Sequence, residues 1–272
     1  MRICPCLLAI VLLSPTLFAA EIPLSPPSKL PNLAPGREWR PIWSDEFDGK
    51  TIDTSKWEVI GDSPRRDGWW TKSAVELDGE GHLVLLTNKE GDRYVSGAVR
   101  TLGKFEHAFG YWEACCKLPT HVGHWPAFWL MPIGGLPDGD GRGRDGTEID
   151  IMEKASLKSM AQHTLHWDGY GKHHKSQAKE VNREGLNDGF HTFALWWTPD
   201  SYVFYVDGEE TWRTTAGGVC QKPAYAKLTE EIGPWAGKIG SAKLPDQFVI
   251  DYVRVFEAAD AQEHGAGDAA AP

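Results

Sequence analysis

The segment FALWWTPDSYVFYVDGEETW, residues 193–212, determines the fold class. Its first apolar run, Phe193–Trp197, ends at the turn residues Thr198–Ser201, and a second run, Tyr202–Val206, follows directly. Asp207–Gly208 is a typical two-residue hairpin turn, after which the chain returns in a third run. The segment therefore predicts consecutive antiparallel strands joined by short turns.

The same pattern recurs along the rest of the chain. His82–Leu86 is a short apolar run after a glycine-containing turn, Gly110–Leu118 alternates and stops at Pro119, and Phe248–Phe256 completes the series. No long segment has the 3.6-residue period of an amphipathic helix. We therefore expect an all-β fold, a sandwich or a barrel, and not an α/β fold.

Length and charge limit the classes of protein to which the chain can belong. Its 272 residues would make one large domain or two small ones, and no second linker interrupts residues 38–258, so we predict one domain there. The net charge is −10 and no basic stripe is present, whereas binding to nucleic-acid phosphates requires clustered Lys and Arg. We expect no nucleic-acid partner, no membrane association and a monomer.

The first 20 residues, MRICPCLLAIVLLSPTLFAA, have the organisation of a secretory signal peptide. Arg2 precedes an apolar run that ends at Leu13 and is too short to span a membrane, and small residues close the segment at Ala19–Ala20. We therefore predict a secreted or periplasmic protein. The predicted organisation is a signal peptide in residues 1–20, a proline-rich linker or arm in 21–37, a folded domain in 38–258 and a disordered tail in 259–272.

Three cysteines, Cys115, Cys116 and Cys220, remain after the predicted signal peptide. Cys115 and Cys116 are adjacent on an expected strand, so their side chains point to opposite faces and they are poor partners for each other. Either one of them pairs with Cys220, or all three are buried thiols. No CxxC spacing indicates a zinc site.

The chemically informative segment is TEIDIME, residues 147–153. Glu148 and Asp150 share one face of an expected strand, with isoleucines on the other face. Glu153 has the wrong parity for that face, and a β-bulge near Ile151–Met152 would restore it. The segment then presents three carboxyl groups on one face of one strand.

Such a row of carboxyl groups is costly in a purely structural element, because each negative charge raises the pKa of its neighbours. Glycoside hydrolysis uses this arrangement, since one carboxylate must be ionised and the other must hold a proton. With the bulge, Glu148 and Glu153 could approach the ~5–5.5 Å separation of a retaining pair. A solvated acidic strand and a cation site made of carboxylates are the alternatives.

The motif EIDIME resembles the active-site signature of glycoside hydrolase family 16, in its bulged, laminarinase-like branch. The agreement extends from Trp43–Gly49 to Asp251–Val255. The resemblance implies a jelly-roll β-sandwich of two antiparallel sheets with a concave substrate cleft. It also implies that Glu148 is the nucleophile, Glu153 the acid/base and Asp150 an auxiliary carboxylate, with no cofactor required for the chemistry and a polysaccharide as the partner.

The same resemblance suggests which residues bind sugar. Trp125 and Trp129 match the family's WPAxW platforms, on which sugar rings stack, and core packing is the alternative for each. Arg100 resembles the family's cleft arginine, with a surface ion pair as the alternative. His166 matches a histidine near the acid/base, and Trp235 matches the late cleft tryptophan.

Two segments depart from the usual laminarinase pattern, namely Leu228–Glu231 and the early loop Gly61–Trp70. In the first, Glu231 or its neighbour Glu230 could accept hydrogen bonds from substrate hydroxyls, or both could be solvated. These departures leave the substrate open between a β-1,3- or β-1,3-1,4-glucan, which we favour, and a galactan such as agar.

Family members often bind a structural calcium ion on the convex face. Glu46, the carbonyl of Gly81 and Asp251 match the places of its ligands, and oxygen ligands suit Ca²⁺. The alternative is that Asp251 is a strand-end carboxylate without a metal. His163 and His166 have no third ligand at suitable spacing, so they do not predict zinc.

We therefore expect a retaining endo-glycosidase that cleaves a β-linked polysaccharide. A galactan hydrolase or a transglycosylase with the same machinery is the alternative within the class. A lectin-like binding sandwich is the alternative outside it. A binding protein has no need of three clustered carboxyl groups, and a purely structural sandwich would leave both these and the paired tryptophans unexplained.

Overall fold

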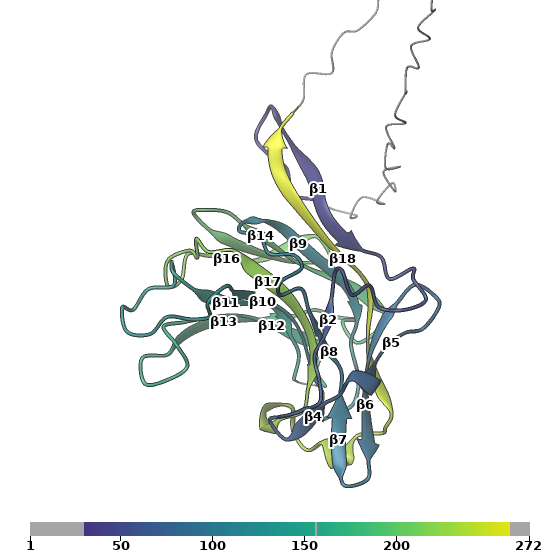
Figure 1. Cartoon of the computed structure of the whole chain (residues 1–272). Coiled ribbons are helices and arrows are strands. Elements are labelled where there is room, and N and C mark those ends of the chain that lie inside the picture. The colour runs from purple at the N-terminus through teal and green to yellow at the C-terminus, as the bar shows by residue number, and fades with distance from the viewer. Residues whose placement is uncertain (1–29, 156, 262–272) are drawn as a thin grey trace, which may run out of the picture.

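The computed structural model describes residues 30–155 and 157–261, which form two stacked β-sheets (Figure 1). The predicted signal peptide, most of the predicted arm and nearly all of the predicted tail lie outside these residues. No helix within the described ranges is long and apolar enough to cross a membrane. The two-sheet sandwich that the sequence predicts is confirmed.

The larger sheet has eleven strands, nine of which follow one another in space from β16 to β3. β1 additionally pairs with β18, and β5 with β6. The pairing of β4 with β7 is parallel, so this sheet is not entirely antiparallel as expected. In spatial order the strands are β16 (Glu209–Thr214), β15 (Tyr202–Val206), β14 (Phe190–Trp197), β9 (Gly110–Lys117), β18 (Asp246–Asp260), β6 (Leu83–Glu90), β7 (Arg93–Ser96), β4 (Gly68–Trp70) and β3 (Ser63–Arg65), with β1 (Arg37–Asp45) and β5 (Val75–Leu77) beside this path.

The smaller sheet has seven antiparallel strands and carries the candidate site. Three short 3₁₀ helices, η1 (Lys72–Ala74), η2 (Pro234–Ala236) and η3 (Ile239–Ser241), lie in connections between strands. The spatial order of the smaller sheet is β13 (Lys175–Asn182), β12 (Met160–Trp167), β11 (Thr147–Glu153), β10 (Trp125–Pro132), β17 (Ala224–Glu231), β8 (Ala98–Arg100) and β2 (Glu58–Val59).

The strands expected from the apolar runs are all present. Residues 193–212 fall in β14, β15 and β16, and the turn at Asp207–Gly208 joins the last two as predicted. Asp207 has a φ of 50° and Gly208 a φ of 73°, the left-handed conformation that a type I′ hairpin turn requires. The turn residues and the alternation therefore determine this part of the topology locally.

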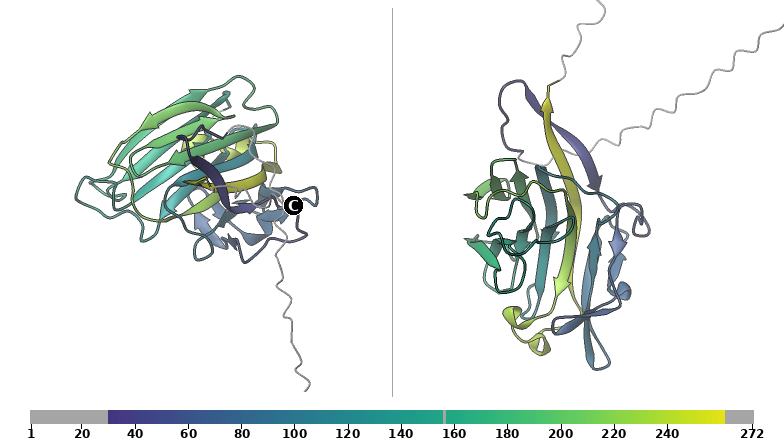
Figure 2. Two further views of the ribbon diagram at one scale, coloured as in Figure 1. Left: turned by 90° about the horizontal axis from the view of Figure 1, so that it is seen from above. Right: turned by 60° about the vertical axis from the view of Figure 1, so that its left-hand side comes forward.

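The longest strand, β18, continues two residues beyond the predicted end of the domain. Its last residues pair with the start of β1, where Arg37 lies opposite Asp260. β1 and β18 extend together past the body of the sandwich (Figure 2). The described end of the predicted arm is also attached, because Trp39 Nε1 donates a hydrogen bond to the carbonyl of Pro31 over 2.8 Å.

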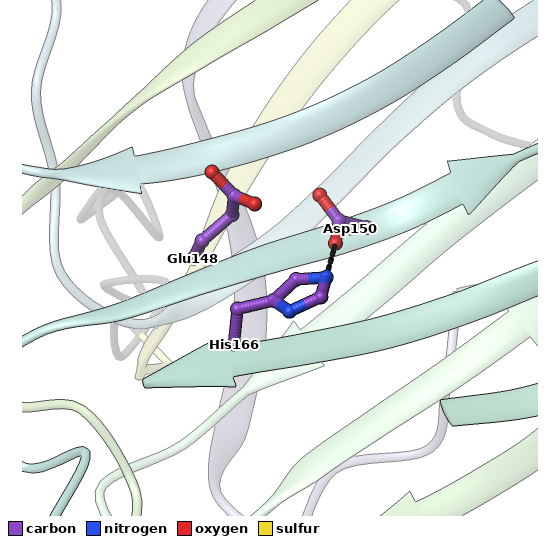
Figure 3. Close-up of side chains that lie close together, drawn as sticks. All are labelled: Glu148, Asp150 and His166. Carbon is purple, nitrogen blue, oxygen red and sulfur yellow. Dashed lines mark ion pairs between the residues drawn. The ribbon is translucent and has the colours of Figure 1, made fainter. Parts of the chain in front are cut away.

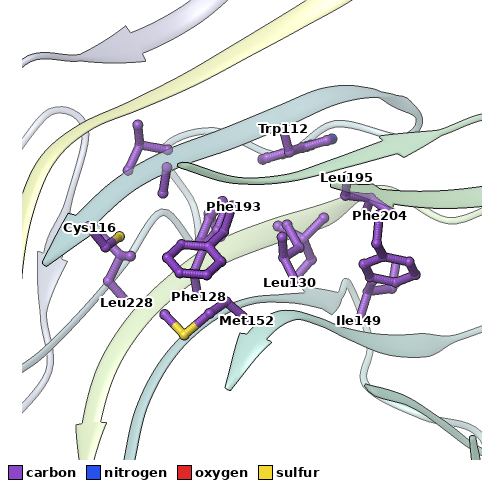
Figure 4. Close-up of a cluster of buried hydrophobic side chains, with 14 of the residues drawn as sticks. Trp112, Cys116, Phe128, Leu130, Ile149, Met152, Phe193, Leu195, Phe204 and Leu228 are labelled. Carbon is purple, nitrogen blue, oxygen red and sulfur yellow. The ribbon is translucent and has the colours of Figure 1, made fainter. Parts of the chain in front are cut away.

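The main hydrophobic core fills the space between the sheets (Figure 4). Alternation along each strand determines which side chains enter it, because successive residues point to opposite faces. The smaller sheet contributes Phe128 and Ile149, and the larger sheet contributes Phe193 and Trp112, all fully buried. Cys115, Cys116 and Cys220 are free and buried, so the thiol alternative holds for them.

Replacing Phe128 with Ala is expected to lower the free energy of unfolding by about 3–5 kcal/mol, because a fully buried ring leaves a cavity between two sheets. Phe190→Ala, at a residue with 41% exposure, is the matched control and should cost less than about 1 kcal/mol. Urea unfolding of both variants measures the difference. Equal losses would contradict the assignment of Phe128 to the core.

Candidate active site

The carboxyl groups of Glu148, Asp150 and Glu153 lie on one face of β11, as predicted. Asp150 pairs with Thr164 and Glu153 with Gln162 on β12, so three steps along β11 match two along its neighbour. The same irregularity appears against β10, where Trp129 lies opposite Asp150. This is the predicted bulge at Ile151–Met152, and it reverses the parity of Glu153.

A buried histidine on the neighbouring strand stabilises the bulge. His163 is fully buried, and its Nδ1 lies 2.6 Å from the carbonyl oxygen of Ile151. Nδ1 therefore donates a hydrogen bond, which leaves Nε2 to accept one from the Thr211 hydroxyl at 2.8 Å. Burial lowers the pKa of His163 to about 4, so the ring is neutral near pH 7. His163 is thus a structural partner of the bulge carbonyl and not a metal ligand.

All three carboxyl groups open into one pocket on the face of the smaller sheet that is turned away from the core. We call this site the carboxylate pocket. Its walls combine carboxylates, cations and aromatic rings from β10, β11, β17 and two loops. The lining residues are Arg65, Arg66, Trp125, Ala127, Trp129, Met131, Glu148, Asp150, Glu153, Tyr170, Lys227, Thr229 and Glu231.

Burial and mutual repulsion raise the pKa of each carboxyl group on β11. Glu148, with 9% exposure, has a pKa raised to about 7, chiefly by burial and further by the charge of Glu153. Asp150 is buried more deeply, and desolvation together with Glu153 and Glu148 raises its pKa well above the ordinary value. Burial also raises the pKa of Glu153. The three groups therefore hold at least one proton near neutral pH.

Two neutral donors orient Glu153. The Trp125 indole N–H donates to Oε1 and the Thr164 hydroxyl donates to Oε2, both over 2.9 Å. Each of these hydrogen bonds lowers the pKa of Glu153 and so counteracts part of the effect of burial. The two hydrogen bonds hold the carboxyl group of Glu153 in one orientation, and the group can still gain or lose a proton.

Glu148 and Asp150 have different partners. The hydroxyl of Tyr170, from the loop after β12, donates to Glu148 Oε2. His166 Nε2 lies 3.4 Å from Asp150 Oδ2, and this ion pair is drawn in Figure 3. Burial and the neighbouring His174 lower the pKa of His166 to about 4, so its ring is neutral, and a proton at this contact stays on Asp150, whose pKa is raised. The sequence predicted His166 beside the acid/base, whereas its ion pair is with Asp150.

The two predicted platform tryptophans share the pocket, and each has a cation over one face of its ring. The guanidinium of Arg66 lies 4.1 Å from the ring centroid of Trp125, and Lys227 Nζ lies 3.7 Å from that of Trp129. Trp235 packs edge-on against Trp125, with 4.7 Å between ring centroids, and keeps 44% of its surface exposed. Trp235 is therefore the most accessible of the three aromatic surfaces for a sugar ring.

Glu231 is in the pocket, as one of the alternatives predicted, but its carboxylate is already engaged. Arg65 donates to Oε1 over 2.5 and 2.8 Å, and Arg66 donates to Oε2. Glu230 points to the opposite face and is fully buried against His124, at 3.1 Å. The alternative that both glutamates are solvated is therefore wrong, because alternation along β17 places one in the pocket and the other inside.

Arg100 lies on the same face of the smaller sheet but outside the carboxylate pocket. Its guanidinium makes two hydrogen bonds to Glu58, of 2.7 and 2.9 Å. The ion-pair alternative for Arg100 is thus the arrangement in this structure. Its distance from the three carboxyl groups follows from the strand order, since β17 and β10 lie between β8 and β11.

Sequence reasoning missed Tyr170 and Lys227 as pocket residues. Lys227 had a detectable signal, because it alternates with core residues in β17 on the same face as Thr229 and Glu231. Tyr170 had none, since it lies in a loop whose course depends on the whole fold. Arg65 and Arg66 were noted in the departing early loop, but no pattern indicated that they would reach Glu231.

One of the three residues matched to a calcium site, Glu46, already has another partner. Both carboxylate oxygens of Glu46 accept hydrogen bonds from Arg254, of 3.0 and 2.7 Å. A cation at Glu46 would compete with this guanidinium and be repelled by it. Asp251 instead faces His82, at 4.0 Å. The calcium site at Glu46, Gly81 and Asp251 therefore stays a prediction, and Arg254 is the partner of Glu46 in the present arrangement.

One other group of possible metal ligands lies close together in the described part of the chain. Carboxylate oxygens of Glu148 and Asp150 and a ring nitrogen of His166 all lie within 4.8 Å of one another. All three belong to the carboxylate pocket or contact it directly. The pKa values of the two carboxyl groups are raised and that of His166 is lowered, so a proton in this group is held by the carboxyl groups and not by the ring.

Comparison with known proteins agrees with this arrangement of sheet and site. A two-sheet sandwich with three carboxyl groups on a bulged strand defines a class of carbohydrate-active jelly rolls. The model of the glycosyl hydrolases family 16 matches residues 63–254. The chain belongs to this family, and its fold is the jelly-roll β-sandwich of that family.

Individual relatives differ in what their names say they act on. The chain is 29% identical over 240 residues to the keratan-sulfate endo-1,4-beta-galactosidase of Sphingobacterium multivorum, covering 79% of this chain and 54% of the relative. It is 29% identical over 251 residues to a beta-glucanase of Rhodothermus marinus, covering 80% and 85%. The laminarinase structure from Flavobacterium sp. UMI-01 superposes with a TM-score of 0.68 at 28% identity, covering 80% of this chain and 100% of that one. The chain thus spans only about half the length of the first of these relatives.

The buried carboxyl groups predict a pH-dependent stability. A carboxyl group whose pKa rises on folding stabilises the folded state fully at pH values below its pKa in the unfolded chain, which is near 4.3. This stabilisation is lost as the pH rises through the pKa in the folded protein, which is about 7 for Glu148. Glu148→Gln should therefore stabilise the fold by about 1–3 kcal/mol at pH 8 and change it little at pH 4. Urea unfolding at both pH values measures this.

The matched control for that experiment is Glu90→Gln, at an exposed position at the end of β6. Its effect on stability should be smaller than that of Glu148→Gln at pH 8. If Glu148→Gln destabilised the fold at pH 8, the pocket would stabilise the ionised carboxylate of Glu148, and the raised pKa inferred from its burial would be wrong.

Proposed function

We propose that this chain is a secreted, retaining endo-glycosidase that hydrolyses a β-linked polysaccharide. Membership of the family supports glycoside hydrolysis as the reaction. The observation that carries the proposal is the bulged strand, which brings Glu148, Asp150 and Glu153 into one pocket. Export is supported by the sequence of residues 1–20 alone.

In the first step, the Glu148 carboxylate attacks the anomeric carbon and a glycosyl–enzyme ester forms. The bond to the leaving oxygen breaks, and Glu153 gives its proton to that oxygen. In the second step, Glu153 takes a proton from water, and the water oxygen displaces Glu148 from the anomeric carbon. The product sugar keeps its β configuration, and both carboxyl groups return to their starting states.

The partners of each carboxyl group support this division of roles. Asp150 is the most deeply buried of the three, so it is the group most favoured to hold a proton. A protonated Asp150 no longer repels Glu148, whose charge the Tyr170 hydroxyl and the field of Lys227 also favour. The first step begins with Glu148 ionised and Glu153 protonated, and burial together with the charge of Glu231 favours the protonated state of Glu153 by raising its pKa.

A glucan backbone is the first candidate substrate. A relative named as a beta-glucanase matches 80% of this chain, and a structure named as a laminarinase covers it to the same extent. A galactan is the second candidate, because a relative named as a keratan-sulfate endo-1,4-beta-galactosidase is equally similar. The cations in the carboxylate pocket favour a charged galactan over a neutral glucan or a neutral galactan, because only the charged polymer offers them an opposite charge.

The decisive measurement is reducing-end release from laminarin, mixed-linkage β-glucan, agarose, porphyran and keratan sulfate. Activity on at least one polymer is expected, and Glu148→Gln and Glu153→Gln should each lower kcat by at least about 10³-fold, because each removes a group that takes part in bond exchange. Proton NMR of the first product should show the β-anomer.

Urea unfolding of Glu148→Gln is the control for these assays, because a variant that is folded but inactive has lost activity and not its fold. Binding of these polymers without cleavage would favour the lectin-like alternative. Products longer than the starting oligosaccharide would identify a transglycosylase. An α-anomer as the first product would contradict the retaining mechanism.

Thr164→Val should move the basic limb of the kcat/KM pH profile to higher pH by about one unit. The Thr164 hydroxyl donates to Glu153 and lowers its pKa, so its removal raises the pKa of the group that must be protonated in the first step. The matched control is Thr87→Val on β6, where a fully buried hydroxyl has no hydrogen-bond partner in the described structure. An unmoved basic limb in Thr164→Val would argue against Glu153 as the acid.

A further inference from the structure

Lys227 is an unusual residue for the floor of a sheet. It lies near the middle of β17, it is only 8% exposed, and it lines the carboxylate pocket. Its Nζ lies 3.7 Å from the ring centroid of Trp129 and 5.5 Å from that of Trp70. In the described part of the chain it makes no ion pair within 4.0 Å. The ammonium group is thus held in place by rings and not by a carboxylate.

The nearby carboxylates are already bound by other donors. Arg65 and Arg66 occupy Glu231, and Arg100 occupies Glu58. Glu153 accepts from two neutral donors on the other side of the pocket. Lys227 is therefore the one cation among the described pocket residues whose charge is not matched by an ion pair.

Keeping a cation there without a partner is costly. Burial, followed by the charge of Arg65, lowers the pKa of Lys227 to about 8, so the group remains mostly protonated at neutral pH. A buried ammonium group that merely filled space could be replaced by an apolar side chain without this desolvation cost. The side of the ammonium group that is turned away from the Trp129 ring can thus donate hydrogen bonds to a ligand.

The strand register places Lys227 relative to the carboxyl groups of β11. Asp150, Trp129, Lys227 and Arg100 face one another in sequence across β11, β10, β17 and β8. At ~4.8 Å between neighbouring strands, Lys227 lies about 10 Å from Asp150 across the sheet. A glycan that reaches Glu148 and crosses the strands in this direction would bring a ring substituent over Lys227.

A second role for Lys227 is to keep Glu148 ionised, since its charge lowers the pKa of that carboxyl. This effect is smaller than those of burial, the Tyr170 hydrogen bond and Glu153. No carboxylate oxygen lies within 4.0 Å of Nζ in the described structure, although an ion pair with Glu148 would be the direct way to achieve such tuning. The unmatched charge is therefore better explained by a ligand.

We propose that the carboxylate pocket contains a subsite for an anionic substituent of the polysaccharide, a sulfate ester or a sugar carboxylate, bound by Lys227 Nζ. Arg65, whose guanidinium lies 4.8 Å from the ring centroid of Trp70, adds positive charge at the same wall. A charge-assisted hydrogen bond in a site shielded from water is stronger than one at the surface. This inference rests on the proposed glycosidase function and specifies its substrate as a charged glycan.

The test compares pairs of polymers that differ in charge. The pairs are keratan sulfate and its desulfated form, porphyran and agarose, and laminarin oxidised at C6 to the carboxylate and native laminarin. The protein should prefer the anionic member of at least one pair by kcat/KM. Lys227→Met should lower that preference roughly 10–100-fold. The pair that responds distinguishes a sulfate from a carboxylate.

Two variants separate charge from other effects of substitution. Lys227→Arg keeps the positive charge and should retain more of the preference for the anionic polymer than Lys227→Met does. Lys117→Met removes an exposed lysine from β9 in the opposite sheet and should keep the full preference. Raising the salt concentration should weaken the preference in the unsubstituted protein.

Each contrary outcome has a distinct meaning. If the protein cleaves glycans but shows no preference for the anionic member of any pair, the anionic subsite is wrong and the proposed function stands. If Lys227→Met lowers kcat/KM equally for both polymers of a pair and shifts the acidic limb of the pH profile, Lys227 acts through Glu148 and the anionic subsite is again wrong. If nothing is cleaved, binding of the same pairs to Glu148→Gln decides, and equal affinity for both members overturns the proposal.

Discussion

The active site depends on one physical constraint, the packing of β11 between a hydrophobic core and a polar pocket. Ile149 and Met152 on one face are fully buried between the two sheets. That burial stabilises a strand whose opposite face carries three carboxyl groups that repel one another. Packing in the core thus keeps the carboxyl groups close together despite their mutual repulsion. The bulge, which His163 contacts at the carbonyl of Ile151, places Glu153 on the same face as the other two.

Charge in the pocket is distributed among three kinds of partner. Glu153 is held by neutral donors and Glu231 by two guanidinium groups, whereas the neutral ring of His166 lies 3.4 Å from Asp150 and makes no hydrogen bond to it. Neutral donors orient a group without fixing its charge, whereas an ion pair favours the ionised state. This difference explains how closely spaced acidic groups can occupy different protonation states in one pocket, and Glu231 positions the two arginines.

The two segments that depart from the laminarinase pattern meet in this pocket. The early loop supplies Arg65 and Arg66, and the late segment adjoining Lys227 supplies Glu231, which binds both arginines. Family membership therefore determines the sheet and its carboxyl groups, while these segments alter the charge that surrounds them. A shared fold does not determine the substrate, and here the difference is concentrated where a sugar ring would bind.

The sequence by itself determined the strands, the hairpin at Asp207–Gly208 and the row of carboxyl groups, because alternation and turn conformation are local properties. Even the bulge was predictable, since only an extra residue restores the parity of Glu153.

Only the tertiary structure decided which side chains pair. Arg65 meets Glu231 across 166 positions of the chain, and Arg254 meets Glu46 across 208. Residue type told us that such groups need partners, but the choice among many opposite charges depends on how the two sheets bring distant loops together. For that reason the row of carboxyl groups on β11 could be predicted from the sequence, whereas Glu58 as the partner of Arg100, the cations over Trp125 and Trp129, and the unmatched Lys227 could not.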